Sequence, residues 1–106
     1  MTDTLTASQQ IAAEVSSWPG VDAGPGPRGE FAFKVDGREI GHLHGDFAAH
    51  FFFPKGIWAE LFAQGRVGHH PVFPDKKGPA ARAIRSDHDI HDVIALMRIN
   101  YDRIRN

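Results

Sequence analysis

Two short runs of alternating apolar and polar residues, joined by an Asp-Gly pair, decide the fold of this 106-residue chain. They read FAFKV at residues 31–35, DG at 36–37 and REIGHLH at 38–44. Asp-Gly is a preferred pair for a two-residue type I′ turn, so the stretch predicts an antiparallel hairpin. Counting outward from the turn pairs Lys34 with Glu39 and Phe33 with Ile40.

This register assigns a face to each side chain of the second run. Side chains two residues apart in a strand point to the same side, so His42 and His44 share a face. In the predicted register Phe33 and Ile40 occupy that face too, so we expect both imidazoles on the core side. A shift of one residue would move them to the other side. The register also separates Glu39 from His42, which argues against an acid-base pair of these two residues.

The flanking segments predict further strands and helices. Apolar residues at helical spacing favour helices over residues 7–18, over 57–62 and from 87 to the last turn, the last one capped by Ser86. Strands are predicted at residues 47–53, and at 67–73 and 80–84 around a turn at 74–79. Residues 21–29 are rich in glycine and proline and are expected to form a loop. Residues 1–6 are expected to be flexible.

Together these elements predict one α+β domain over residues 1–106. It has an N-terminal helix, an antiparallel sheet of four to five strands, and a middle helix and a long C-terminal helix packed on one face. This order is similar to that of the frataxin-like fold, including the YjbR-type domains, which are suspected of binding DNA. The similarity is one of topology and implies a fold, not a function.

The composition excludes several classes of function. The chain has no cysteine, so any metal must be held by His, Asp or Glu. A formal net charge of -1 lacks the positive field that non-specific nucleic-acid binding uses, which argues against a nucleic-acid partner. No apolar run approaches the roughly 20 residues of a membrane span, and the N-terminus lacks a basic, apolar leader. We therefore expect a cytoplasmic protein without a membrane partner.

Histidines form the candidate site, and three interpretations of them stay open. Imidazoles on one face coordinate Zn²⁺, Fe²⁺ or Ni²⁺, or line a pocket for an organic ligand, or bond to the backbone at the margin of the core. The candidate ligand-binding residues are His42, His44, Asp46, His69 and His70, with His50 as a further metal ligand. Because His69 and His70 are adjacent, at most one of them joins the first pair. Asp46 follows a glycine and also suits a turn.

Three other patterns carry alternatives. His88 and His91 share one side of the last predicted helix, which is typical of a solvated face and also allows an accessory metal site. The Phe51–Phe53 run is typical of a buried strand and would also line an apolar cavity. A basic cluster is the candidate for phosphate contact or for a partner that binds the loop 74–85: Lys55, Lys76, Lys77, Arg82 and Arg85.

Four motifs together resemble a known family. WPGV at residues 18–21, GREIGHLHGD at 37–46, HH at 69–70 and LMRINY at 96–101 are similar to the luciferase-like domain family of small bacterial proteins. The resemblance runs from about Val15 to the C-terminus, and residues 38–46 are its most specific part. Where many members have Pro-Asp followed by Gly-Trp, this chain has PDKKGP at 74–79, so no role of an aromatic residue is transferred there.

We therefore expect a small domain that binds a small molecule in a histidine-lined pocket on its sheet. A histidine-based metal-binding protein is the first alternative. A protein or nucleic-acid interaction module that uses the loop 74–85 is the second.

Overall fold

The computed structural model describes residues 4–106, which form three helices and a six-stranded antiparallel sheet. The helices are α1 (Ala7–Val15), α2 (Lys55–Ala63) and α3 (Asp87–Arg105). The strands are β1 (Val21–Pro25), β2 (Phe31–Val35), β3 (Arg38–His44), β4 (Ala48–Phe52), β5 (Gly68–His69) and β6 (Pro79–Ala83). The sheet order is β1-β2-β3-β4-β6-β5. The predicted α+β class is confirmed, with six strands where four to five were expected.

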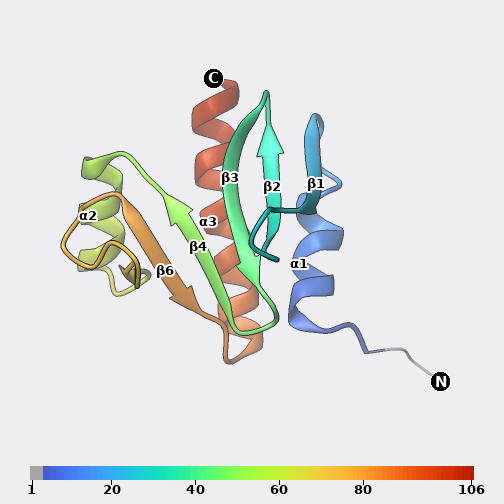
Figure 1. The fold of residues 1–106 in the computed structure, drawn as a ribbon, viewed down its shortest axis with the longest axis horizontal. Helices are drawn as coiled ribbons and strands as arrows, with labels where there is room; N and C mark the ends of the chain where they lie inside the picture. The colour runs from blue at the N-terminus through green and yellow to red at the C-terminus, as the bar shows by residue number, and fades with distance from the viewer. Residues whose placement is uncertain (1–3) are drawn as a thin grey trace.

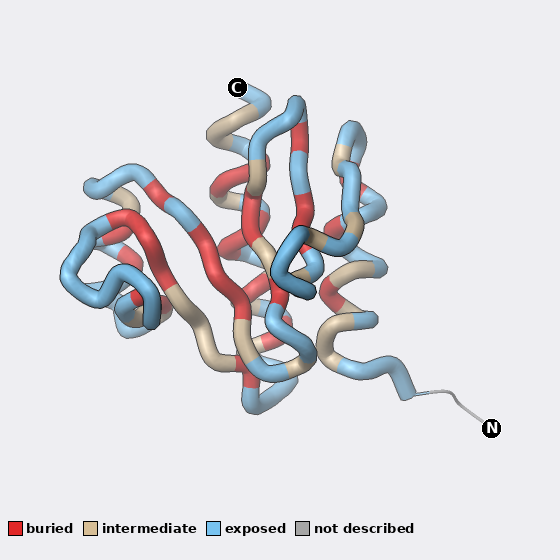
Figure 2. Tube along the Cα trace, in the orientation of Figure 1, coloured by how far each residue is buried: buried red, intermediate tan, exposed pale blue. Residues whose placement is uncertain are grey.

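The helices lie behind the sheet in the view of Figure 1, so one face of the sheet is covered and the other is open. Buried residues run along the strands and along the helix sides that meet them (Figure 2). The largest fully buried side chains between the two layers include Phe33, Leu43, Phe51, Leu96 and Met97. Within residues 4–106, no helix combines the length and the apolar character needed to cross a membrane.

Local signals place the starts of α1 and α3 where the sequence predicted them. Thr6 caps α1 in a capping box with Gln9, and the Ser86 side chain caps α3 by accepting from the Asp89 amide. Two bounds differ from the prediction: α1 stops at Val15 instead of residue 18, and α2 spans Lys55–Ala63 instead of 57–62. Of residues 1–6, for which flexibility was expected, residues 1–3 lie outside the described residues.

The first strand was predicted as loop, and this prediction is wrong. β1 pairs along its whole length with β2, from Val21 opposite Val35 to Pro25 opposite Phe31. Its glycine and proline are tolerated because β1 is an edge strand, where a missing amide donor on the outer side breaks no ladder. Only the second part of the expected loop, residues 26–29, connects two strands, together with Glu30.

The hairpin turn is as predicted, but its register changes two residues further on. Asp36 and Gly37 have φ angles of 51° and 77°, as a type I′ turn requires. Lys34 pairs with Glu39 as predicted, whereas Phe33 pairs with Gly41 instead of Ile40. Ile40 is therefore the extra residue of a β-bulge.

The bulge reverses the predicted direction of both histidines. Beyond Ile40, the residues that point to the helices are Gly41 and Leu43, while His42 and His44 point to the open face. The physical reason is packing against α3, because Ile40 is fully buried and a Cβ at position 41 would lie 2.6 Å from the Met97 sulfur. Two consecutive residues thus face the helices, which regular alternation does not allow.

Asn100 of α3 stabilises the sheet beside the bulge. β3 and β4 pair from His44 to His42 and then separate toward the upper end of Figure 1. The Asn100 amide nitrogen donates to the carbonyl of Ile40 at 3.2 Å and to that of Phe52 at 3.1 Å. One fully buried side chain therefore holds the two strands that carry the central histidines.

Candidate functional site

Four histidines gather on the open face of the sheet and are called the histidine cluster here: His42, His44, His50 and His70. His42 lies directly opposite His50 across β3 and β4, and His44 follows on the same side of β3. The ring centroids of His44 and His50 are 4.4 Å apart, and those of His50 and His70 are 4.3 Å apart. The cluster thus unites three strand positions with a residue that follows β5.

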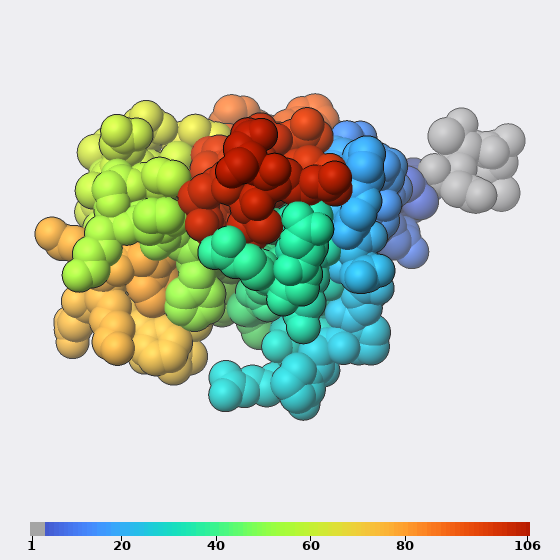
Figure 3. Space-filling model, turned by 90° about the horizontal axis from the view of Figure 1, so that it is seen from above, coloured from blue at the N-terminus to red at the C-terminus, as the bar shows by residue number. Residues whose placement is uncertain are grey.

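Two connecting segments flank this face and form, together with it, a cavity of about 250 Å³. Arg28 and Glu30 line it from the 26–30 loop, and Val72 and Phe73 line it from the opposite side. In Figure 3 the helices lie at the top, and the 26–30 loop (cyan) and the 70–78 segment (orange) project at the bottom with a hollow between them. The four histidines and Phe52 complete the lining.

Burial keeps the inner members of the cluster neutral. His50 is 9% exposed and His70 is 6% exposed. Burial, and to a smaller extent the charges that His70, His44 and His42 would carry, together lower the pKa of His50 to about 4. The pKa of His70 is lowered by burial and then by His42 and His44. At neutral pH these two rings therefore offer uncharged nitrogen lone pairs and N–H donors.

Hydrogen bonds assign the proton positions of two rings. His42 Nδ1 lies 2.9 Å from a carboxylate oxygen of Glu39, which only accepts, so Nδ1 carries the proton. The prediction that these two residues face opposite ways is wrong, because the bulge brings them to one side. His70 Nδ1 accepts from the Val72 amide at 3.1 Å, so its proton is on Nε2.

The match to a protein family decides the identity of this domain. Residues 37–100, more than half of the chain, match the Luciferase domain family. The chain belongs to the Luciferase domain family. The matched part includes every member of the histidine cluster, whereas the 26–30 loop lies outside it. Comparisons with curated proteins and with solved structures found no match.

Two of the candidate residues lie away from the cluster of this Luciferase domain. The Asp46 carboxylate accepts from the Ser8 amide at 2.8 Å and from the Ser8 hydroxyl at 2.6 Å, and these bonds lower its pKa. Asp46 thereby fastens the β3–β4 turn to the start of α1. His69 points to the helix side, where its ring lies 5.6 Å from Trp58 and 4.9 Å from Phe62.

His50 was named from the sequence only as a further metal ligand, yet it lies at the centre of the cluster. The signal that finds it is the turn at residues 45–47. Counting outward from that turn pairs His44 with Ala48 and His42 with His50, as observed. The neighbouring Phe run is divided between two roles. Phe51 is fully buried in the core, while Phe52 is 49% exposed and lines the cavity.

The basic cluster is not a uniform surface. Arg82 bonds to Asp89 at 2.6 Å and also to Asp92, which Arg66 contacts at 2.7 Å. This network attaches β6 to α3, and its Arg82 side chain is only 13% exposed. A partner of the loop 74–85 would therefore meet lysines and Arg85 without Arg82. His88 and His91 are both exposed on α3.

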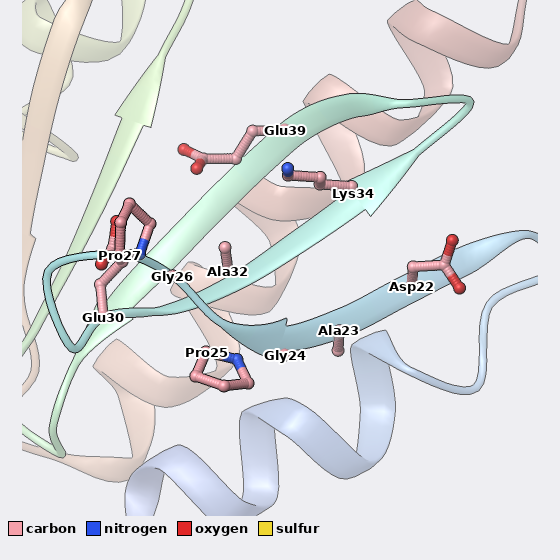
Figure 4. Close-up of a pocket in the computed structure, with 10 residues that line it drawn as sticks. All are labelled: Asp22, Ala23, Gly24, Pro25, Gly26, Pro27, Glu30, Ala32, Lys34 and Glu39. Carbon is pink, nitrogen blue, oxygen red and sulfur yellow. The ribbon is translucent and has the colours of Figure 1, made fainter.

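A second cavity continues the open face of the Luciferase domain toward β1. It has a volume of about 370 Å³ and is lined by residues of β1, β2, β3 and the 26–30 loop. Figure 4 shows Lys34 and Glu39 on neighbouring strands and the 26–30 loop crossing one end. Glu30 lines both cavities, and Glu39 connects this one to His42.

Proposed function

We propose that this Luciferase-domain protein binds a small molecule in the cavity over the histidine cluster. The observation that carries the proposal is the placement of two buried, neutral histidines, His50 and His70, against an open cavity of about 250 Å³. Binding pockets combine apolar walls with a few convergent polar groups, and this lining has both.

The lining suggests the kind of molecule. Typical ligand pockets measure roughly 300–1,000 Å³, so a cavity of about 250 Å³ suits a ligand at the small end of that range. Phe52 and Phe73 offer aromatic surfaces, the Nε2–H of His70 offers a donor, and Arg28 contributes a positive charge at the wall. A compound with one aromatic ring and an oxygen acceptor matches these groups.

Four probes test the proposal: benzoate, 4-hydroxybenzoate, catechol and benzylamine. Each is titrated into ¹⁵N-labelled, chelator-treated protein, and amide chemical shifts are followed. We expect shifts confined to residues 28–30, 42–52 and 70–73 for at least one of the oxygen-bearing probes, and none for the cation. If no probe gives localised shifts, the proposed pocket is wrong.

A pair of double variants separates a site from a structural role. His42→Ala with His44→Ala should abolish the localised shifts while the far-UV circular dichroism stays that of the wild type. His88→Ala with His91→Ala removes the same number of imidazoles from α3 and should leave the shifts unchanged. If the first double variant unfolds, the pair is structural and the proposal loses its basis.

A further inference from the structure

Three imidazoles of the cluster are arranged as ligands of one ion. One nitrogen each of His42, His44 and His50 lies within 4.8 Å of the other two. Two imidazole nitrogens bound to one tetrahedral ion, at about 2.0–2.1 Å each, lie about 3.4 Å apart. The rings therefore need to approach by at most about 1.4 Å. Histidine χ2 is a broad torsion, so turning the rings provides this approach while the strands stay in place.

Glu39 prepares His42 for such a role. Its carboxylate accepts the Nδ1 proton of His42 at 2.9 Å, which leaves the Nε2 lone pair free. Carboxylates in this position orient metal-binding histidines and raise their basicity. The pair is partly buried, with side-chain exposures of 13% for His42 and 30% for Glu39.

His70 lies beside the three rings but is not available as a fourth ligand. Because its Nδ1 accepts from the Val72 amide, its Nε2 carries the proton and has no free lone pair. Its ring centroid is 4.3 Å from that of His50, so His70 borders the three rings without completing their ligand set. This arrangement suits a site with three protein ligands and one position for water or an organic ligand, as in catalytic zinc sites.

We infer that His42, His44 and His50 bind one divalent first-row transition-metal ion, with Glu39 as the positioning residue and one coordination position open to the cavity. Imidazole donors select Zn²⁺, Co²⁺, Fe²⁺, Ni²⁺ or Cu²⁺ over Mg²⁺ and Ca²⁺, which prefer oxygen. The inference rests on the proposed function, since the ion would form the floor of the same pocket. A ligand with an oxygen donor would then complete the coordination.

Co²⁺ is the probe, because its visible absorption reports the number and geometry of its ligands. Tag-free protein is stripped with a chelator and titrated with Co²⁺, and the dissociation constant of Zn²⁺ is then measured by competition. We expect one equivalent of each ion to bind. Absence of a saturable Co²⁺ spectrum, or the same affinity for Mg²⁺, would overturn the inference.

Variants assign the ligands. His44→Ala and His50→Ala should each weaken Zn²⁺ binding by more than the about 10–100-fold expected for Glu39→Gln, which changes only the positioning residue. His70→Ala should keep the affinity within about threefold and the Co²⁺ spectrum unchanged, and so should the double variant His88→Ala with His91→Ala. His44 is exposed, so its variant stays informative if His50→Ala unfolds. Binding that survives His44→Ala refutes the assignment.

The two proposals fail separately. Organic probes that bind chelator-treated protein while Co²⁺ does not bind would leave the proposed function intact and remove the metal site. Co²⁺ binding without any localised shifts from the organic probes, in either the metal-free or the metal-loaded protein, would keep the metal site and refute the proposed binding of a small molecule.

Discussion

Removing the Asn100 side chain should destabilise the domain more than any other single truncation of a polar residue in α3. Asn100 is fully buried, and its two N–H groups donate to the carbonyls of Ile40 and Phe52. Asn100→Ala removes this donor from the buried Ile40 carbonyl and from the partly buried Phe52 carbonyl. Each unsatisfied group costs about 1–3 kcal/mol, so we expect a loss of about 2–6 kcal/mol in the free energy of unfolding. Domains of this size have only about 5–15 kcal/mol in total.

Urea unfolding followed by tryptophan fluorescence measures this loss. Trp18 and Trp58 are 8% and 4% exposed, so their emission should respond to unfolding. Arg103→Ala is the matched control, because within residues 4–106 Arg103 donates only to the Asn100 oxygen, at 3.0 and 3.2 Å, and its loss leaves the two carbonyl bonds in place. We expect it to cost about 0.5–1.5 kcal/mol.

Asn100→Asp sharpens the comparison. It keeps the size of the side chain but places an oxygen, which only accepts when ionised, against two carbonyl oxygens. It should therefore be at least as destabilising as Asn100→Ala. If Asn100→Ala lies within about 0.5 kcal/mol of the wild type, or costs no more than Arg103→Ala, then the bridge between β3 and β4 is not what holds the bulge.

Three further outcomes follow from the fold. In chelator-treated protein the pKa of His50 is near 4, against an ordinary value of 6.5, so the unfolded chain binds more protons than the folded one between these two pH values. The free energy of unfolding should therefore fall by at most about 3 kcal/mol from pH 6.5 to 4. His50→Gln should reduce this pH dependence, as measured by urea unfolding at several pH values. Gly41→Ala should lower the free energy of unfolding by about 1–3 kcal/mol, because the added Cβ would lie 2.6 Å from the Met97 sulfur in α3. Gly56→Ala in α2 adds a Cβ in open space, so thermal unfolding should show it to be neutral or stabilising. Burial opposes ionisation of Asp92, but hydrogen bonds and charge interactions with Arg66 and Arg82 outweigh this effect and lower the pKa of Asp92. The stability that ionised Asp92 contributes should therefore be lost only as the pH falls below about 3.9. In urea unfolding, Arg82→Ala should remove about 2–3 kcal/mol at pH 7 and less at pH 3.

Short-range signals explain why much of the fold could be predicted. The Asp36–Gly37 turn and the Ser86 cap act within a few residues of chain, so the sequence is sufficient to locate them. The same holds for the apolar stripe of α3. The edge strand β1 was missed for the opposite reason, since its residues disfavour a strand and only pairing with β2 makes it one.

The candidate site depends on long-range contacts, which limits its prediction. That His42 and His44 lie on the same side of β3 is a local property of the strand. Which side they occupy is decided by the bulge at Ile40, and the bulge is held by a residue of α3 that lies 60 positions away. Strand alternation alone therefore gave the wrong face, although it named the correct pair.

The bulge also explains how this sheet combines a tight core with a polar site on the same strand. Regular alternation would have to place either Ile40 or Gly41 toward the cavity. With the extra residue, Ile40 fills the core, the missing side chain of Gly41 admits Met97, and the alternation restarts with His42 outward. Glu39, on the other side of the bulge, then comes within 2.9 Å of the His42 ring instead of facing away from it. The proton position that frees the His42 Nε2 lone pair is thus a consequence of how β3 packs against α3, so a variant that removes the bulge should lose metal affinity even if all three histidines remain.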